Sequence, residues 1–350
     1  MIKIEKVKSY DGNESQLKDF MDDYYTRVTS DYSPLDSLEL CINKKRMYLK
    51  KPLGEEKELM EVDLTDDQLE LITDLKNQFE KIIKSTPKQL EKLALSLGKP
   101  NMFGAVENGK FKSNKFGEAL LKTFGYGDYF RSKERKGKWY AKVLNIRSCP
   151  YCNSQYTLSM IDSNKSGTLT KFQFDHFFSK TRYPFLSISM FNLIPSCPAC
   201  NLSKSNADVR IKTHYHPYYN TMAGRSKFVL NYNVDLKSLS MAKVEQLKLT
   251  IEFNPKYPSQ SKFVEQHDKQ YHISAIYQMH DDIARDLLRK AIINNSSYKK
   301  DVFKVKGLFS GSDKEYRRYL LGNYTDSSEI LNRPLAKFYQ DLAEQLKLFK

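Results

Sequence analysis

The spacing of apolar residues predicts two consecutive helices in the first third of the chain. The first helix would begin at Asp66, its N-cap, and end before Pro87, since proline does not continue a helix. Its apolar stripe consists of Leu69, Ile72, Phe79 and Ile83. The second helix would run from Pro87 to Leu97 and end before Gly98. The flanking parts show weaker periodicity: residues 1–62 look mixed and partly loop-like. Residues 101–137 look like a loop with one short helix over residues 116–124.

In the middle of the chain the hydrophobic period changes from helical to alternating. Residues 155–161 and 168–178 look like two strands joined by a polar turn at 162–167. An apolar stretch follows at 185–194, and Asn201 is expected to open a short helix.

After Pro258 the chain becomes helical again, with two further apolar stripes. The first stripe consists of Ile276, Met279, Ile283 and Leu287. The second consists of Leu335, Phe338, Leu342 and Leu346, in a helix that would have Pro334 at its first position.

Composition narrows the class of protein. The 350 residues are 40% apolar, which is enough for a core, and no stretch approaches the 18 apolar residues of a membrane-spanning helix. The first residues lack the apolar segment of a secretory signal. We therefore expect a soluble, cytoplasmic protein that is not bound to a membrane.

The net charge of +15 is distributed unevenly. Residues 1–100 contain 17 Lys and Arg and 20 Asp and Glu, whereas residues 101–350 contain 40 and 22. A basic excess of this kind favours a polyanionic partner such as nucleic acid. The alternative is a compositional bias, because the chain is rich in Lys, Asn, Tyr and Ile throughout.

Four of the five cysteines form two C-x-x-C pairs separated by 44 residues. In a reducing compartment, the pairs Cys149/Cys152 and Cys197/Cys200 suit zinc better than disulfides, and two such turns complete a tetrahedral site. A redox role for the pairs is the alternative. Cys41 stands apart and is expected to be a small buried hydrophobe.

The segment between the cysteine pairs contains residues suited to phosphodiester hydrolysis. His176 has an imidazole whose ordinary pKa near 6.5 suits a general base that activates water. Asp175 supplies a carboxylate and Asn201 an amide oxygen, and hard cations such as Mg²⁺ or Mn²⁺ prefer oxygen ligands of these kinds. Asn192 lies on the loop that would complete the site.

The order of these parts resembles the zinc-braced HNH endonuclease motif over about residues 148–206. The resemblance implies two strands and a helix around one divalent metal ion, the ββα-metal finger. It implies that His176 is the general base, Asp175 a metal ligand and Asn192 the residue that holds the loop and the imidazole in place. Asn201 stands where many members have a final His, so it would be the second metal ligand of an HNN variant. Lys204 fits the Lys often found one helical turn later.

Two further segments resemble HNH nuclease subunits of the Septu and related retron systems of bacterial anti-phage defence. These segments are residues 174–187 and residues 333–337, which read Arg-Pro-Leu-Ala-Lys. That resemblance implies a neighbouring ATPase subunit as a partner. The chain itself contains no G-x-x-x-x-G-K-[ST] loop, so an ATP-dependent step would belong to that partner.

Several alternatives stay open from the sequence. Lys180, Arg182 and Lys204 contact phosphate or are merely solvated. His214 and His216 are expected to be structural or partner-facing, and the alternative is that they bind a metal ion or the scissile strand. The same site would also cut RNA, such as a tRNA, since its metal and base do not distinguish the sugars. A zinc module that only binds nucleic acid is the non-catalytic reading.

Together these features predict an α+β protein: a mainly helical chain with a central ββα-metal (HNH) module stapled by a four-cysteine zinc site. The expected domains are a mostly helical one at 1–140 that would bind a partner, the nuclease module at 141–220, and a basic, mainly helical one at 221–350. The expected function is a DNA endonuclease that uses structural Zn²⁺ and catalytic Mg²⁺ or Mn²⁺, acts on double-stranded DNA, and serves as the effector of an anti-phage system.

Overall fold

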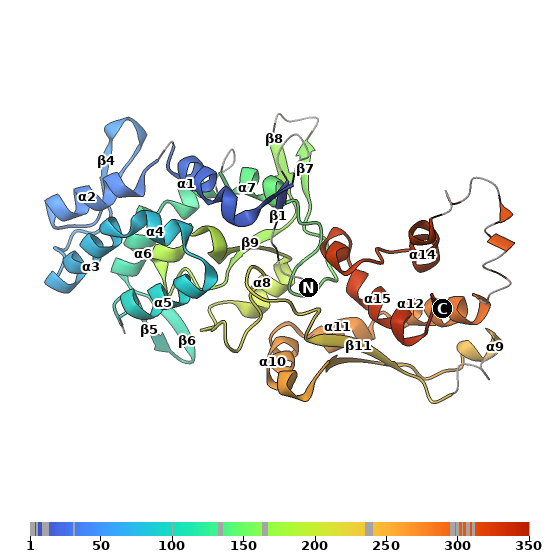
Figure 1. Ribbon diagram of the computed structural model, residues 1–350. Helices are drawn as coiled ribbons and strands as arrows, with labels where there is room; N and C mark the ends of the chain where they lie inside the picture. The colour runs from blue at the N-terminus through green and yellow to red at the C-terminus, as the bar shows by residue number, and fades with distance from the viewer. Residues whose placement is uncertain are drawn as a thin grey trace. The chain divides into compact units, whose positions relative to one another are not determined.

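A computed structural model describes most of the chain (Figure 1). The described residues are 4, 6–8, 14–30, 32–99, 101–131, 136–162, 167–234, 241–294, 298, 301–302, 304–305, 309 and 312–349. The chain forms two compact units, each with its own core. The first unit comprises Ile4–Asn145 and Leu158–Lys212, and the second comprises Ile146–Thr157 and Thr213–Lys350.

The first unit begins with short elements that the sequence pattern did not predict. In order they are β1 (Lys6–Lys8), β2 (Glu14–Gln16), η1 (Leu17–Phe20), α1 (Met21–Thr29), α2 (Pro34–Lys44), β3 (Tyr48–Lys50), η2 (Pro52–Gly54) and β4 (Glu56–Glu58). Only Tyr24 and Val28 of α1 are buried. The region is mixed, as expected, but it contains more regular structure than its weak periodicity indicated, because helices with few buried positions leave little pattern to read.

The helical pattern after residue 65 corresponds to three helices. They are α3 (Asp66–Asn77), α4 (Phe79–Lys84) and α5 (Pro87–Leu97). The prediction of α5 is confirmed at both ends. The N-cap of α3 is Thr65 rather than Asp66, since Thr65 forms a capping box with Gln68. The expected single helix is interrupted at Gln78, whose backbone is not helical.

A hairpin, a helix and a single π-helical turn occupy most of the region expected to be a loop. The elements are β5 (Gly104–Glu107), β6 (Lys110–Ser113), α6 (Lys115–Thr123), η3 (Tyr126–Phe130) and α7 (Lys136–Leu144). The short helix predicted at 116–124 is α6. The hairpin turns at Asn108 and Gly109, which both have positive φ, and Asn-Gly is a strong signal for such a turn.

The segment between the cysteine pairs folds as two antiparallel hairpins and a helix. The first hairpin is β7 (Ser159–Asp162) with β8 (Gly167–Thr170), and the turn residues 163–166 lie outside the described residues. The second is β9 (Gln173–His176) with β10 (Leu193–Ser196). The predicted strand at 168–178 is therefore two strands separated by a bend. The elements that follow β9 are η4 (Pro184–Leu186), η5 (Met190–Asn192) and, after β10, α8 (Pro198–Lys204). The helix expected to open at Asn201 begins three residues earlier.

The second unit packs helices on a two-stranded hairpin. The elements are β11 (Ser226–Asn231), α9 (Met241–Val244), β12 (Thr250–Pro255), η7 (Pro258–Gln260), α10 (Ser261–Tyr271), α11 (Ile273–Gln278), α12 (Asp281–Ile293), α14 (Asp313–Leu321), η8 (Ser327–Asn332) and α15 (Ala336–Gln345). Helix α15 packs against β11, and α10 and α11 pack against β12.

Two predictions for this unit need correction. Met279 is largely exposed, because α11 ends at Gln278 and the apolar stripe does not continue into α12. Of the predicted stripe Leu287 is buried, and the other buried positions there are Ile273, Tyr277, Ala284 and Leu288. Pro334 is not the first residue of α15, which begins at Ala336 after Leu335 adopts a left-handed conformation.

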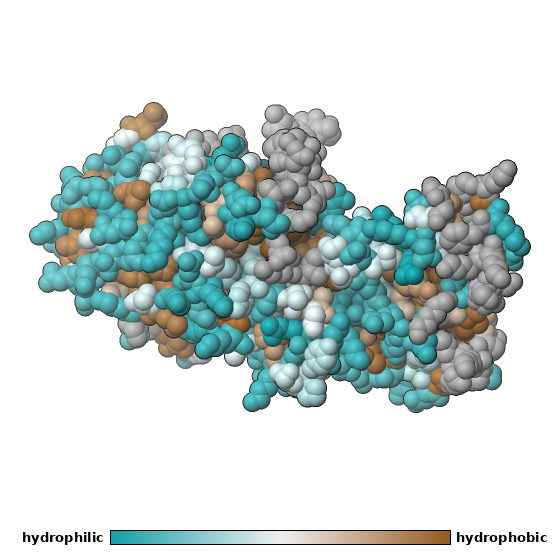
Figure 2. All heavy atoms as spheres, in the orientation of Figure 1, coloured by the Kyte–Doolittle hydropathy of each residue, from teal (hydrophilic) through white to brown (hydrophobic). Residues whose placement is uncertain are grey.

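The fold is a mixture of helix and strand that contains a four-cysteine cluster. Hydrophilic side chains cover much of the face in Figure 2, with smaller apolar patches among them. In the part of the chain that the structure describes, no helix has the length and apolar character needed to cross a membrane.

Candidate metal centre and active site

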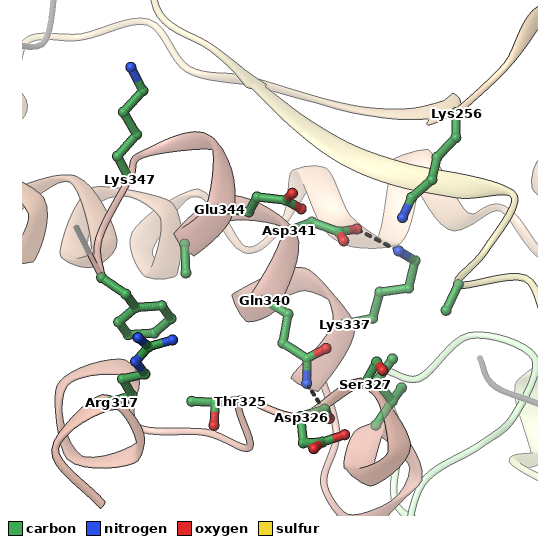
Figure 3. Close-up of a pocket in the computed structure, with 14 residues that line it drawn as sticks. Lys256, Arg317, Thr325, Asp326, Ser327, Lys337, Gln340, Asp341, Glu344 and Lys347 are labelled. Atoms are coloured by element: carbon green, nitrogen blue, oxygen red, sulfur yellow. Dashed lines mark hydrogen bonds and ion pairs between the residues drawn. The ribbon is translucent and has the colours of Figure 1, made fainter. Parts of the chain in front are cut away.

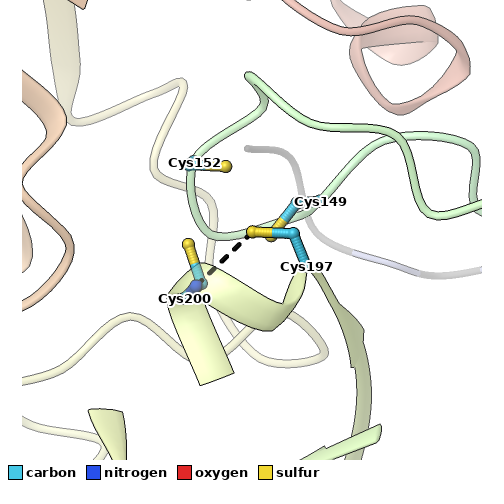
Figure 4. A group of neighbouring side chains, drawn as sticks. All are labelled: Cys149, Cys152, Cys197 and Cys200. Carbon is cyan, nitrogen blue, oxygen red and sulfur yellow. Dashed lines mark hydrogen bonds between the residues drawn. The ribbon is translucent and has the colours of Figure 1, made fainter. Parts of the chain in front are cut away.

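Four buried cysteines form a group that can hold a metal ion (Figure 4). The Sγ atoms of Cys149, Cys152, Cys197 and Cys200 all lie within 4.8 Å of one another. A tetrahedral zinc site with Zn–S bonds of about 2.3 Å requires sulfur atoms about 3.8 Å apart. The thiolate donors and their spacing therefore fit zinc. Cys41 is fully buried elsewhere, and burial raises the pKa of its thiol to about 11, as expected of a structural cysteine.

The turn that contains Cys149 and Cys152 is held by hydrogen bonds to its own backbone and to α10 and α11. The Cys149 amide donates to the Gln155 carbonyl at 2.9 Å. His267 on α10 donates from Nε2 to the Tyr151 carbonyl at 2.8 Å, and the Tyr277 hydroxyl on α11 donates to the Cys152 carbonyl at 2.8 Å. These outer contacts fix the orientation of the turn, as is common around metal ligands.

Asn153 connects the same turn to the Arg-Pro-Leu-Ala-Lys segment. Its Nδ2 donates to the Ile330 carbonyl at 2.9 Å, and its Oδ1 accepts the Lys337 amide at 3.0 Å. Its own carbonyl accepts the Leu335 amide at 2.5 Å. The side chain is fully buried, and its positive φ of 56° is one that Asn tolerates well. The segment at 333–337 thus supports the turn that holds two of the cysteines.

The second cysteine pair lies at the start of α8. Cys197 is the N-cap, and its Sγ accepts the Cys200 amide at 3.4 Å, the dashed line in Figure 4. Pro198 occupies the first helical position, where proline is favoured. The helix then places Asn201 and Lys204 one turn apart.

Asp175 and His176 form the last two positions of β9. His176 pairs with Leu193 and Asp175 with Ile194 across the antiparallel hairpin, and α8 packs against β9. Both side chains are buried. The pattern changes directly after His176, where the Phe177 amide donates to the Asn192 carbonyl at 3.0 Å.

The His176 imidazole is held in one tautomer. Its Nε2 lies 2.9 Å from the Ser187 carbonyl oxygen, which can only accept, so Nε2 carries the proton. The Tyr126 ring packs edge-on against the imidazole, with 4.4 Å between the ring centroids. Burial lowers the pKa of His176 well below its ordinary value, and the charges of Lys180, Lys204 and Arg131 act in the same direction. The ring is therefore neutral at pH 7, with its Nδ1 lone pair in the state required of a base.

Lys204 is buried and paired with Asp175. Its Nζ lies 3.0 Å from Asp175 Oδ1 and donates to the His176 carbonyl at 2.5 Å. With its ammonium engaged in this way, Lys204 does not face solvent as a phosphate contact would. The structure instead places it as the counter-charge of the candidate metal ligand.

Asn192 links the end of β9 to the loop that follows. Its Oδ1 accepts the Phe178 amide at 2.7 Å, and its Nδ2 donates to the carbonyls of Phe178 at 3.0 Å and Leu186 at 2.9 Å. The side chain is fully buried. This arrangement holds the loop that carries the Ser187 carbonyl, and hence the acceptor of the His176 proton.

Asn201 and Asp175 are the two oxygen donors predicted to bind a divalent cation. Asn201 Nδ2 donates to Gln173 Oε1 at 2.6 Å. This bond uses the nitrogen of the amide, so Oδ1 of Asn201 is the atom that would bind a cation. A carboxylate and an amide oxygen on packed elements suit a hard cation in chemical kind, and Mg²⁺ commonly takes few protein ligands and several waters. Because the charge of Lys204 offsets that of Asp175, these two ligands should bind a cation less tightly than they would if Asp175 were unpaired.

Lys180 and Arg182 differ in their surroundings. Lys180 Nζ lies 5.4 Å over the centroid of the Tyr126 ring, next to His176. Burial lowers its pKa, as do the charges of Arg131 and Lys204, while Asp175 raises it. Arg182 Nε donates to the Asn206 carbonyl at 3.0 Å, and its guanidinium lies over the Phe111 ring. Lys180 is thus close to the candidate base, whereas Arg182 packs in protein contacts.

A cavity of about 220 Å³ lies beside this group, entirely within the first unit. It is lined by Tyr126, Arg131, Gly137, Lys138, Thr170, Phe172, Gln173, Phe174, Lys180 and Asn201. Of these residues the sequence pattern had indicated only Lys180 and Asn201 as functional. The basic character of 133–138 and the Phe172/Phe174 alternation were visible in the sequence, but nothing in it placed them beside His176.

A larger hollow, of about 660 Å³, lies in the second unit (Figure 3). It contains charges of both signs, and its buried Lys337 pairs with Asp341 at 2.7 Å. The two histidines of the same unit make contacts of a structural kind. His216 is buried, and its Nδ1 accepts the Tyr218 amide at 3.2 Å, while His214 contacts Thr213 and Gln266. The lining of the hollow contains four cations and three carboxylates, so its charge favours no particular class of ligand.

Comparison with known proteins finds no family model, no curated protein and no solved structure that matches this chain.

Proposed function

We propose that this protein is a metal-dependent endonuclease of the HNH type that hydrolyses phosphodiester bonds in DNA. The observation that carries the proposal is the placement of His176. Its Nε2 donates to the Ser187 carbonyl at 2.9 Å, and the imidazole lies at the end of β9 next to the Asp175 carboxylate. A general base needs a fixed orientation and an available lone pair, and with the proton on Nε2 that lone pair is on Nδ1.

Each residue around His176 has a distinct part in the proposed reaction. His176 accepts a proton from water at Nδ1, and the bond to Ser187 supports the imidazolium that forms. Asn192 holds the loop that presents Ser187, so it is a positioning residue. Asp175 and Asn201 would hold Mg²⁺ or Mn²⁺, which when bound stabilises the negative charge of the phosphate and the leaving oxygen. Zinc at the four cysteines would be structural, because all four ligand positions come from protein.

A supercoiled-plasmid assay with Mg²⁺ or Mn²⁺ tests the proposal. Wild type should nick or cut the plasmid, and His176→Ala should be slower by about 10²–10⁴-fold, the usual contribution of a general base. The matched control is His272→Asn, because His272 is exposed and its left-handed backbone tolerates Asn. Equal cleavage by wild type and His176→Ala would contradict the proposal.

Two other outcomes would assign a different function to the protein. Cleavage of folded RNA by wild type alone, with the plasmid left intact, would make the enzyme a ribonuclease with the same base. Binding of nucleic acid that ignores divalent metal, with no cleavage of either substrate, would identify a non-catalytic zinc module. The ATPase partner and the role in anti-phage defence stay predictions from the resemblance alone.

A further inference from the structure

The cavity beside His176 combines positive charge with aromatic rings. Arg131, Lys138 and Lys180 line it, and no carboxylate is among the described residues that do so. None of these three cations forms an ion pair with any residue in the described part of the chain. Asp175 offsets part of the charge at Lys180, but it pairs with Lys204 and does not line the cavity, so an anionic ligand there would relieve the repulsion among the three cations.

The aromatic side chains give the cavity a surface for a planar group. Phe172 and Phe174 are half-buried, and their rings meet edge to face with 5.3 Å between the centroids. Phe174 also stacks on Tyr140, which fixes its ring from behind. Phe172 is therefore the ring best placed to stack on a base, an interaction worth about 1–3 kcal/mol per base in single-strand binding proteins.

The size and position of the cavity limit what it can take. Its volume of about 220 Å³ is below that of drug-sized pockets, so the two paired strands of a double helix cannot enter it together. Tyr126 lines the cavity and also packs against His176, so a phosphate bound there lies next to the candidate base.

We propose that this cavity holds one unpaired nucleotide of the substrate strand, with its phosphate among Arg131, Lys138 and Lys180 and its base against Phe172. The inference rests on the proposed function, which makes the substrate a nucleic acid, and it narrows that substrate to strands with an unpaired segment. A gap, a loop or an unwound region would then bind better than a fully paired duplex.

The test measures binding of fluorescent oligonucleotides by anisotropy in buffer without Mg²⁺ or Mn²⁺, so that cleavage does not interfere. The probes are a 12-nucleotide single-stranded DNA, the duplex of the same sequence and the corresponding single-stranded RNA. The variants are Arg131→Gln/Lys138→Gln, Phe172→Ala and the control Lys115→Gln, an exposed lysine on α6 outside the cavity. The melting temperature of each variant checks that it is folded.

Wild type and Lys115→Gln should bind the single strand at least tenfold more tightly than the duplex. The double variant should lose about tenfold or more in affinity, and its salt dependence should fall by up to about 0.7, the value for one phosphate that is no longer neutralised. Phe172→Ala should lose most of the preference for the single strand. A single-stranded RNA that binds with the same dependence, and more tightly than DNA, would support the cavity and make its nucleotide a ribonucleotide.

Several results would overturn the inference. The double variant could bind with the same affinity as wild type, wild type could bind the duplex more tightly than the single strand, or wild type could bind none of the probes. Plasmid cleavage separates this failure from failure of the proposed function. If wild type cuts the plasmid while the cavity variants bind normally, only the proposal for the cavity fails. If wild type binds through the cavity but cuts no substrate with either metal, only the proposed nuclease activity fails.

Discussion

A buried carboxylate, a buried ammonium and a neutral imidazole come together at the end of β9. Asp175 and Lys204 are each almost fully buried, and their ion pair is reinforced by the bond from Lys204 to the His176 carbonyl. A buried pair gains little over an apolar one, but removing one member leaves a charge without compensation. The pair therefore ties α8 to the end of β9 at the point where the candidate base lies.

Lys204→Met should destabilise the protein by about 3–5 kcal/mol, because Asp175 then stays buried without its counter-charge. Denaturant unfolding without added Mg²⁺ or Mn²⁺ measures this loss. The double variant Asp175→Asn/Lys204→Met should recover much of it, since both charges are then absent. If Asp175 binds a divalent cation, Mg²⁺ should restabilise Lys204→Met more than it does wild type. Additive losses in the double variant would show that the two side chains do not act as a pair.

At the scale of elements, α10 and α11 support the turn that carries Cys149 and Cys152. His267 on α10 is buried and donates to the Tyr151 carbonyl, while its Nδ1 is buried with no hydrogen-bond partner among the described residues. Burial lowers its pKa to about 4, with the hydrogen bond to Tyr151 acting in the opposite direction. Protonation of Nδ1 would place a charge in this apolar environment, so the fold favours the neutral ring.

Stability should therefore fall as the pH drops from about 6.5 towards 4. In this window the unfolded chain binds a proton at His267 that the folded chain does not, so acid favours unfolding by up to about 3 kcal/mol. His267→Gln can keep the bond to Tyr151 but does not titrate, so its stability should depend less on pH. The measurement is the difference in unfolding free energy between wild type and variant at pH 7.5, 5.5 and 4.5. Loss of zinc in acid affects wild type and His267→Gln alike, so it cancels in this difference. If the unfolding free energies of the two proteins change in parallel with pH, the prediction is wrong.

The elements also show which patterns can be read from a sequence. Helix α5 was predicted at both ends because Pro87 begins it, Gly98 follows it and five buried positions mark its face. Helix α1 was missed because only Tyr24 and Val28 are buried, and α2 was missed although it is as long as α5, because its buried positions include a serine and a proline and form a weaker apolar stripe. The break at Gln78 between α3 and α4 was missed because the helical spacing of apolar residues continues across it, although the backbone of Gln78 is not helical.

For the whole molecule, the four-cysteine cluster joins segments that lie 44 residues apart in the sequence. A metal ion that binds the folded chain and not the unfolded one adds its binding free energy to stability. Closing a long loop also restricts the unfolded chain. Zinc would thus act on the fold as a whole, whereas His176 acts only at its own site.

Wild type should contain about one zinc ion per chain, measured by metal analysis of the purified protein. Cys197→Ser should lose the metal and lower the melting temperature by about 10 °C or more, because several kcal/mol of stability are lost. Cys41→Ala should keep the zinc, since Cys41 is outside the cluster. His176→Ala should keep both zinc and melting temperature. Equal zinc content in Cys197→Ser and wild type would rule out the assigned ligands.

The sequence by itself determined the features that depend on local spacing and chemical type. The two C-x-x-C pairs indicated a four-cysteine metal cluster, and the alternation within residues 168–178 indicated extended chain that includes Asp175 and His176, which lie in β9. The proposed roles of Asp175, His176 and Asn201 stay predictions from residue type and order. Local spacing carries this information because the geometry of a turn or a strand fixes where its next few side chains lie.

Only the tertiary structure decided which distant side chains meet. It paired Lys204 with Asp175 instead of exposing it, directed the Nε2–H of His176 to the Ser187 carbonyl, and placed Arg131 and Lys138 beside Phe172. It also set Asn153 against the segment at 333–337. Such contacts depend on how elements pack, and packing depends on the burial of whole faces rather than on the spacing of neighbouring residues.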